Sequence, residues 1–353
     1  MATDTLLRGV SDLFATSRPA TRRVAVEQEL IARDAVDGSI VLVDRVRRAT
    51  RGSSYAESLG FEPGGQVELS LPCSPSITEL ERQLHVTIDG LRSDCAAAGV
   101  LLDADPVDPR GHEVPLQLGS RRYVEMQRHF DRIGPHGRRM MRLTASTQVC
   151  LDWWPGRVGL EQWRLSQLAG PFVAALFARA HGPDSRLAVW LAVDPVRTAF
   201  DDRLLGDDPV RRYWQFAATA QPFAVPDQAG AAVAHHLSTL FPPVRPRGSY
   251  LEFRYLDAQP EDRVSVAATL LATLLYDDES RRGALQLLAE EGPHLNSLWR
   301  SAALAPGELV GQGGELVDLA LDGISRAPGG YLPGDAALRL CALGPTTSLV
   351  GAA

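Results

Sequence analysis

The sequence predicts an α+β fold, in which helices cover the apolar face of an antiparallel sheet and the opposite, concave face is polar. Two observations support this prediction. Four segments alternate polar and apolar residues, as half-buried strands do. Helical patterns separate these segments and dominate from residue 260 onward. Because the 353 residues contain no repeat and no convincing boundary, we expect one domain over residues 1–353.

Composition narrows the class of protein. Hydrophobic residues make up 45% of the chain, charged residues 22%, and the net charge is −7, which argues against a general nucleic-acid or acidic-membrane binder. The longest apolar runs, 168–178 and 264–276, are too short to span a bilayer. Residues 1–21 lack the apolar core of a secretory signal, and the four cysteines form no C-x-x-C pair. We therefore expect a cytoplasmic protein whose partners are small molecules.

All 36 basic residues are arginine, and the chain contains no lysine. This excludes a Walker-type phosphate loop, which needs a lysine, and any Schiff-base chemistry on a lysine amine. If the protein handles ATP, the phosphates must be bound by arginine, backbone amides and metal ions.

The first part of the chain alternates short strands with helices. Pro63-Gly64-Gly65 predicts a tight turn, because proline fixes its own φ and glycine accepts a positive φ. Ser76 is a helix cap, since Glu79 stands three residues after it. In order, we expect a helix over 4–15, strands over 23–31 and 39–43, the turn at 63–65, a strand over 66–71, a helix over 76–98 and a strand over 100–104.

The rest of the chain carries two further strands among helices. Residues 140–153 contain a strong alternation, and residues 250–257 form a second strand directly after a rigid, proline-rich loop at 241–248. Residues 222–234 resemble a connection, being rich in alanine, proline and glycine. We expect helices over 121–133, 160–180, 185–192, 262–276, 280–288, 295–302 and 308–325.

Four of the predicted strands each present two polar side chains on the face opposite their apolar residues. Converging carboxylates repel one another unless cations neutralise them, and Mg²⁺ prefers such oxygen ligands. An arginine on the same surface suits a phosphate. The residues alone thus favour a Mg²⁺–nucleotide site, and the alternative is four ordinary solvated faces. The pairs are Glu27 with Glu29, Gln66 with Glu68, Ser146 with Gln148, and Glu252 with Arg254.

A series of motifs runs in order through residues 22–300. The series consists of Val26-Glu27-Gln28-Glu29-Leu30, Phe61-Glu62-Pro63-Gly64-Gly65-Gln66-Val67-Glu68-Leu69-Ser70, Arg122-Tyr123-x-x-Met126, Thr144 to Asp152, Arg186-x-x-x-Trp190, Phe241 to Gly248, and Leu251 to Ala258. This series resembles the glutamate–cysteine ligase family of plants and actinobacteria, and most of all its members in ergothioneine biosynthesis.

The resemblance implies a fold and a reaction. The fold is glutamine-synthetase-like, with a curved antiparallel sheet that forms a funnel backed by helices. In the reaction, Mg²⁺–ATP phosphorylates the γ-carboxylate of glutamate, and the amine of an acceptor, cysteine in the family, displaces the phosphate to give a γ-glutamyl amide.

The resemblance also implies roles for individual residues. The expected metal ligands are Glu27, Glu29, Glu68 and Glu252. Glu68, Glu252 and Arg254 are expected to be catalytic. Glu62, Gln66, Gln148 and Arg254 would bind the ATP side of the site. Arg122, Tyr123, Gln148 and Arg186 would contact the substrates.

The chain departs from the family pattern on the acceptor side. Residues 177–185 replace a longer loop, the stretch between Trp214 and His235 is also reduced, and Cys150 stands where asparagine is usual. Three functions therefore stay open: a ligase that uses cysteine, a ligase of the same chemistry with another amine or amino acid, and a binding protein that keeps the fold without turnover. The oligomeric state is not indicated.

Overall fold

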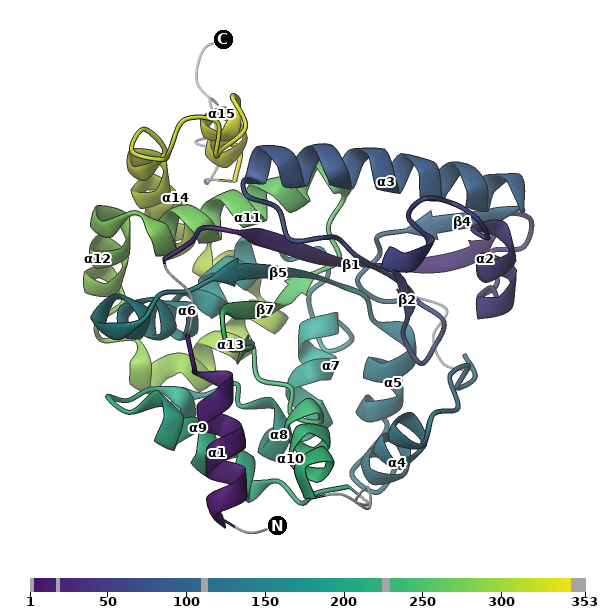
Figure 1. Cartoon of the computed structure of the whole chain (residues 1–353), viewed down its shortest axis with the longest axis horizontal. Coiled ribbons are helices and arrows are strands. Elements are labelled where there is room, and N and C mark those ends of the chain that lie inside the picture. Colours follow the sequence, from purple (N-terminus) through teal and green to yellow (C-terminus); the bar gives the residue numbers. More distant parts are fainter. Residues whose placement is uncertain (1–2, 17–19, 109–113, 224–228, 344–353) are drawn as a thin grey trace.

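The computed structural model describes residues 3–16, 20–108, 114–223 and 229–343, and it is built around one antiparallel sheet (Figure 1). Six strands lie in the order β2-β3-β1-β5-β7-β6, and β4 pairs with the far end of β1. The strands are β1 (Val24–Asp34), β2 (Leu59–Phe61), β3 (Val67–Ser70), β4 (Val100–Asp103), β5 (Ser146–Asp152), β6 (Val244–Pro246) and β7 (Tyr250–Asp257).

The long strand β1 fixes which side chains share a face. Glu27 pairs with Ser70 on β3 and with Gln148 on β5, and Glu29 pairs with Glu68. Directly paired residues point to the same face of a sheet, so these polar side chains converge. The β5–β7 pairing shifts register between Thr147 and Val149, at Gln148.

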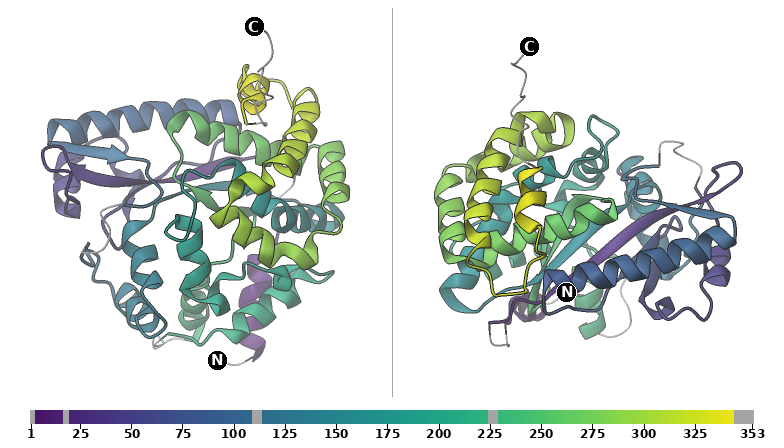
Figure 2. Two further views of the ribbon diagram at one scale, coloured as in Figure 1. Left: turned by 180° about the vertical axis from the view of Figure 1, so that it is seen from behind. Right: turned by 90° about the horizontal axis from the view of Figure 1, so that it is seen from above.

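Three long helices cover the apolar face of the sheet. They are α3 (Ile77–Ala97), α6 (Gly156–Leu176) and α11 (Glu261–Tyr276), which contact β1, β7 and β5 respectively (Figures 1 and 2). The main core between sheet and helices includes Val26, Leu69, Val149, Phe253 and Leu84. Burying this face leaves the opposite face of the same strands for polar side chains.

Three other helices and a smaller apolar cluster stand beside the polar face. The helices are α4 (Arg121–Phe130), α5 (His136–Leu143) and α7 (Arg186–Val193). Their cluster contains Met126, Phe130, Met141, Val189 and Phe241. These three helices therefore have an apolar cluster of their own, separate from the main core.

The remaining helices pack around these two layers, and the C-terminal ones gather at the end of the molecule away from α4 and α5 (Figures 1 and 2). Among the described residues, no helix is both long and apolar enough to cross a membrane. These helices are α1 (Thr3–Leu13), α2 (Val43–Ala49), α8 (Pro195–Thr198), α9 (Pro209–Thr219), α10 (Ala229–Ser238), α12 (Asp278–Leu287), α13 (Leu295–Leu304), α14 (Val310–Ile324) and α15 (Ala336–Cys341), with 3₁₀ turns η1 (Ala56–Ser58), η2 (Asp202–Leu204), η3 (Gly292–His294) and η4 (Pro306–Leu309).

The α+β prediction is confirmed, as are the four polar strands, the turn at 63–65 and the helices predicted after residue 260. The predicted strand over 39–43 is wrong. Only Ile40 forms a bridge, to Arg33, and α2 begins at Val43. Gly38, with φ 69°, reverses the chain direction, and the few residues between it and α2 pair with β1 through this one bridge.

Three further predictions need correction. Residues 140–143 belong to α5 rather than to the strand, because Met140 and Met141 pack into the smaller cluster as part of the buried face of that helix. Residues 229–238, which overlap the end of the connection predicted over 222–234, form α10, and residues 224–228 of that connection lie outside the described residues. The proline-rich loop contains β6, where Pro246 is tolerated because β6 lies at the edge of the sheet.

Candidate functional site

A hairpin between β2 and β3 positions Glu62 and Glu68. Its turn closes through a hydrogen bond from the Gly65 amide to the Glu62 carbonyl at 2.8 Å. Gly65 has φ 93°, and a Cβ on Gly64 would lie 2.3 Å from the Arg142 carbonyl oxygen, so both positions require glycine. The predicted turn thus sets the spacing of two carboxylates.

The Gln66 side chain supports this turn. Its amide oxygen accepts from the Gly64 amide at 3.1 Å, and its amide nitrogen donates to the Thr144 carbonyl at 2.8 Å. Gln66 borders the cavity beside the hairpin, but both ends of its amide are bound to backbone. It therefore ties β3 to the segment that precedes β5.

Three carboxylates meet on the polar face, and we call Glu29, Glu62 and Glu68 the acidic triad. One oxygen atom from each lies within 4.8 Å of the others. Glu29 is fixed by the backbone amide of Ser146 at 2.7 Å and by the side-chain amide of Gln148 at 3.1 Å. Three oxygen ligands at this spacing could hold one divalent cation.

The electrostatics of the acidic triad favour a cation. Burial raises the pKa of Glu62 well above its ordinary value, and the charges of Glu29 and Glu68 raise it further. Burial likewise raises the pKa of Glu29. Glu27, two residues before Glu29 on β1, has a pKa raised by burial and then by Glu68. Without a cation these carboxylates hold protons more tightly than exposed ones do.

Three arginines surround Glu252, and we call Arg245, Arg247 and Arg254 the arginine group. Glu252 is only 1% exposed. It accepts from Arg245 at 3.2 Å and from Arg247 at 2.7 Å, and it also pairs with Arg254. Three guanidinium groups against one carboxylate leave an excess of positive charge, which suits a phosphate.

Burial also lowers the pKa of two members of the arginine group. Burial first, and then the charge of a neighbouring arginine, lowers the pKa of Arg254 to about 9 and that of Arg245 to about 10. The Nε atoms of Arg254 and Arg245 are buried without a hydrogen-bond partner among the described residues. An anion that approached these two side chains would find donors available.

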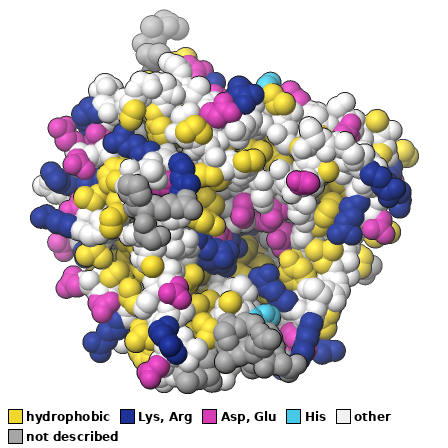
Figure 3. Space-filling model, in the orientation of Figure 1, with side chains coloured by type: hydrophobic (Ala, Val, Ile, Leu, Met, Phe, Trp, Pro, Cys, Tyr) yellow, Lys and Arg dark blue, Asp and Glu magenta, His cyan; other side chains and the backbone are white. Residues whose placement is uncertain are grey.

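Gln148 connects the acidic triad to the arginine group. Its amide oxygen accepts from Arg254 at 2.6 Å, while its amide nitrogen donates to Glu29. Opposite charges therefore lie next to each other on one sheet face. Figure 3 shows acidic and basic side chains side by side in the hollow near the middle of this surface.

Two cavities border the site. One, of about 80 Å³, adjoins Glu29, Glu62 and Arg254 and is walled by residues of α4, α5 and α7. The other, of about 320 Å³, lies along the same sheet face; its lining includes Glu27, Ser70, Cys73, Cys150 and Tyr250. One cavity therefore adjoins the acidic triad and Arg254, and the other adjoins Glu27.

Arg122 and Tyr123 of α4 line the smaller cavity, and their role as substrate contacts stays a prediction. Burial raises the pKa of Tyr123 to about 12, and the charge of Glu62 contributes next, so the phenol stays protonated. Arg122 donates to the Ser238 carbonyl at 3.0 Å, and its buried Nε has no partner among the described residues.

Two predicted site residues have unexpected neighbours. Glu252, expected with the metal ligands, lies within the arginine group rather than in the acidic triad. Arg186, expected near substrate, is 2% exposed and donates to the carbonyls of Arg254 at 2.8 Å and Tyr255 at 3.2 Å. Its guanidinium carbon also lies 5.2 Å from the centre of the Trp190 ring. Arg186 therefore connects α7 to the backbone of β7.

Sequence reasoning missed Arg245 and Arg247 as site residues. The signal was present, because arginine alternates with proline directly before a polar strand. The predicted rigid loop concealed it, since a loop gives no information on which way a side chain points. In β6, Arg245 pairs directly with Glu252 and therefore shares its face.

Comparison with known proteins identifies related sequences. Residues 23–304 match the family model described as glutamate-cysteine ligase family 2 (GCS2). The chain is 33% identical over 283 residues to the glutamate–cysteine ligase EgtA of Mycolicibacterium smegmatis, an alignment covering 69% of this chain and 64% of EgtA. It is 24% identical to the chloroplastic glutamate–cysteine ligase of Arabidopsis thaliana, covering 76% of this chain and 60% of the relative. The chain thus spans less than two thirds of either relative.

Solved structures share the fold. The glutamate–cysteine ligase of Francisella tularensis, in complex with AMP, superposes with a TM-score of 0.55 at 12% identity, over 93% of this chain and 82% of that one. A bifunctional glutathione synthetase from Pasteurella multocida gives a TM-score of 0.52 at 13% identity, over 96% of this chain and 47% of that one.

Proposed function

The chain belongs to glutamate–cysteine ligase family 2, and from this premise we propose that it is an ATP- and Mg²⁺-dependent ligase that forms a γ-glutamyl amide, with cysteine as the default acceptor. One observation carries the proposal: Gln148 links an acidic triad to an arginine group on a single sheet face. A metal–phosphate complex needs both kinds of surface side by side.

The acidic triad fits Mg²⁺. Its donors are carboxylate oxygens, three of them lie within 4.8 Å of one another, and burial raises the pKa values of Glu29 and Glu62, so a cation would stabilise their charged forms. Glu29, Glu62 and Glu68 would hold the ion, and Glu27 would lie beside it. When bound, Mg²⁺ supplies neutralisation of the charge on the transferring phosphoryl group.

The arginine group fits the phosphates of ATP. A chain without lysine must bind phosphate through arginine or the backbone, and Arg254 offers a planar fork whose Nε has no partner in the described parts of the chain. Glu252 orients all three guanidinium groups. Arg254 is the best placed of the three for the transferred phosphoryl group, because Gln148 joins it to the acidic triad.

The proposed reaction has two steps. An oxygen of the glutamate γ-carboxylate takes the γ-phosphoryl group of ATP, giving ADP and γ-glutamyl phosphate. The amine of the acceptor then attacks the acyl carbon, loses a proton and releases inorganic phosphate. The residues contribute chiefly position and charge compensation, and Arg122 and Tyr123 would contact the amino-acid substrates in the smaller cavity.

A panel of acceptors tests the proposal. Purified protein with Mg²⁺, ATP and glutamate is given cysteine or other amines, while ADP release and product mass are measured. γ-Glutamylcysteine would support the default acceptor. A different γ-glutamyl amide would support the alternative that the shorter acceptor-side segments suggest, namely the same chemistry with another amine. Folded protein that turns over no pairing would overturn the proposal.

A further inference from the structure

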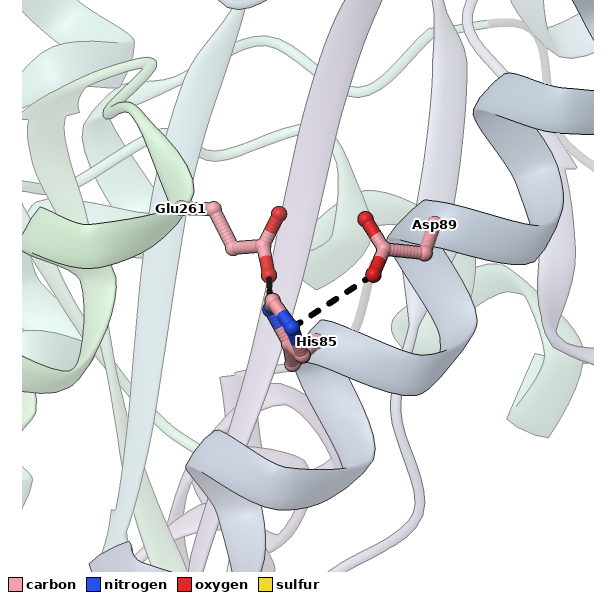
Figure 4. Close-up of side chains that lie close together, drawn as sticks. All are labelled: His85, Asp89 and Glu261. Carbon is pink, nitrogen blue, oxygen red and sulfur yellow. Dashed lines mark hydrogen bonds and ion pairs between the residues drawn. The ribbon is translucent and has the colours of Figure 1, made fainter.

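A second group of metal-ligand residues lies on the opposite side of the sheet from the acidic triad, where α3 meets α11. His85 and Asp89 stand four residues apart on α3 and therefore share one helix face. Glu261 lies in the first turn of α11 and points toward them from the neighbouring helix (Figure 4). The three side chains come from segments separated by more than 170 residues of sequence.

The three side chains are already close. His85 Nδ1 lies 2.5 Å from an Oε1 atom of Glu261, and His85 Nε2 lies 3.4 Å from Asp89 Oδ2 (Figure 4). One ligand atom from each residue lies within 4.8 Å of the others. The side chains of His85 and Asp89 are 69% and 61% exposed, so an ion can enter from solvent without any opening of the fold.

From this geometry we propose that His85, Asp89 and Glu261 form a surface site for a divalent transition-metal ion of the Zn²⁺ class. One imidazole nitrogen and two carboxylate oxygens are ligands that Zn²⁺ accepts, and water would complete a tetrahedral set. The histidine separates this site from the acidic triad, whose all-oxygen ligands suit Mg²⁺ instead.

Arg92 prepares Glu261 for this role. Its Nη1 lies 3.2 Å from Glu261 Oε2, the oxygen that His85 does not contact. The salt bridge fixes the carboxylate and leaves Oε1 directed at His85, as an outer partner orients a metal ligand. Arg92 also reduces the negative charge of the group without occupying the ligand atom.

An ion at this site would fasten α3 to α11. Glu261 follows β7 by only a few residues, and β7 carries Glu252 and Arg254. The ion would therefore stabilise the packing of the helices behind the sheet, close to the end of β7, without contacting the polar face. Metal bound at this site should therefore raise the unfolding temperature and the metal content of the protein, and it should not add a chemical step.

Metal titration of the full chain tests the proposal. Protein freed of metal by a chelator is titrated with Zn²⁺ by calorimetry in excess Mg²⁺, which fills the acidic triad. We expect His85→Ala and Asp89→Asn to weaken Zn²⁺ binding at this site by at least about tenfold, while both variants keep the wild-type unfolding temperature when metal-free and the wild-type ATP turnover.

A matched variant and a spectroscopic probe complete the test. His294→Ala removes an exposed histidine that belongs to no such group among the described residues, and the variant should bind Zn²⁺ as the wild type does. Co²⁺ in place of Zn²⁺ should give visible absorption that His85→Ala lacks. The proposal is overturned if wild type and His85→Ala bind the same amount of Zn²⁺ with the same affinity, or if the wild type binds none.

Discussion

Arg254 donates a hydrogen bond to the side-chain oxygen of Gln148 across 2.6 Å, and this contact places the arginine group next to the acidic triad. The same amide donates to Glu29. Because neutral Gln148 lies between Glu29 and Arg254, it can hold both in place without a direct ion pair between them. Arg254 pairs with Glu252 instead, and its Nε has no hydrogen-bond partner among the described residues.

Replacing Gln148 with leucine tests this link. Gln148→Leu keeps the size of the side chain but removes both hydrogen bonds to charged partners, so we expect turnover to fall roughly 10–100-fold. Steady-state ADP release measures the effect. Gln167→Leu, which removes a buried amide on α6, is the matched control and should retain activity. Unchanged turnover in Gln148→Leu would show that the link is not used.

Neutralising Glu68 should separate activity from stability. Glu68→Gln removes one charge of the acidic triad, so we expect turnover to fall at least about tenfold. The unfolding temperature of the metal-free protein should not decrease, because repulsion within the triad is relieved. Glu57→Gln, at an exposed position in η1, serves as the control for a surface glutamate. Full activity in Glu68→Gln would refute the proposed metal site.

The stabilisation that Mg²⁺ gives should depend on pH. Folding raises the pKa of Glu29 and Glu62, so the metal-free folded chain keeps protons that the unfolded chain has released. The contribution of the triad to the free energy of folding therefore falls as pH rises from the ordinary pKa of glutamate to the raised pKa values in the folded chain. Mg²⁺ then compensates the charge that the lost protons leave. We expect Mg²⁺ to raise the unfolding temperature more at about pH 8 than at about pH 5.5. Equal shifts at both pH values would contradict this.

A methyl group at Gly64 should disturb the hairpin that carries Glu62 and Glu68. Its Cβ would lie 2.3 Å from the Arg142 carbonyl oxygen, and neither backbone can yield easily. We expect Gly64→Ala to lower the free energy of unfolding by about 1–3 kcal/mol and to weaken Mg²⁺ binding. Denaturant unfolding and calorimetry measure the two effects. Gly119→Ala, whose added Cβ would have no described residue within 4 Å, should be nearly neutral.

Arg186 offers a test between two roles. If it supports β7, Arg186→Met leaves the carbonyls of Arg254 and Tyr255 without their donor, and we expect a loss of about 1–3 kcal/mol in the free energy of unfolding. If it contacts substrate, as the resemblance implies, the KM for glutamate rises while stability is kept. Urea unfolding and steady-state kinetics on the same preparation distinguish these outcomes.

Much of the polar sheet face could be predicted from the sequence. Alternation alone placed Glu27, Glu29, Glu68 and Gln148 on strands with their side chains opposite the core, because a strand has a strict period of two. The turn before β3 was equally clear, since Pro63 and two glycines leave few backbone choices.

The sequence did not show which strands pair with one another in the sheet. Alternation says which face a residue shares within its own strand but not which strand lies beside it. The resemblance implied that Glu252 is a metal ligand, and only the register with Arg245 shows that arginines surround it. It also implied that Arg186 contacts substrate, and the sequence does not reveal that carbonyls of β7 lie within reach of this side chain. Both roles stay predictions.

The two halves of the site also differ in when they are synthesised. The acidic triad comes from residues 29–68, a hairpin and the strand beside it, whereas the arginine group comes from residues 245–254. A growing chain thus brings the carboxylates together before any of these guanidinium groups has left the ribosome. Until β7 docks, only divalent ions or protons can compensate that charge, so we expect folding of the sheet to be more sensitive to ionic conditions before the arginine group is in place than after it.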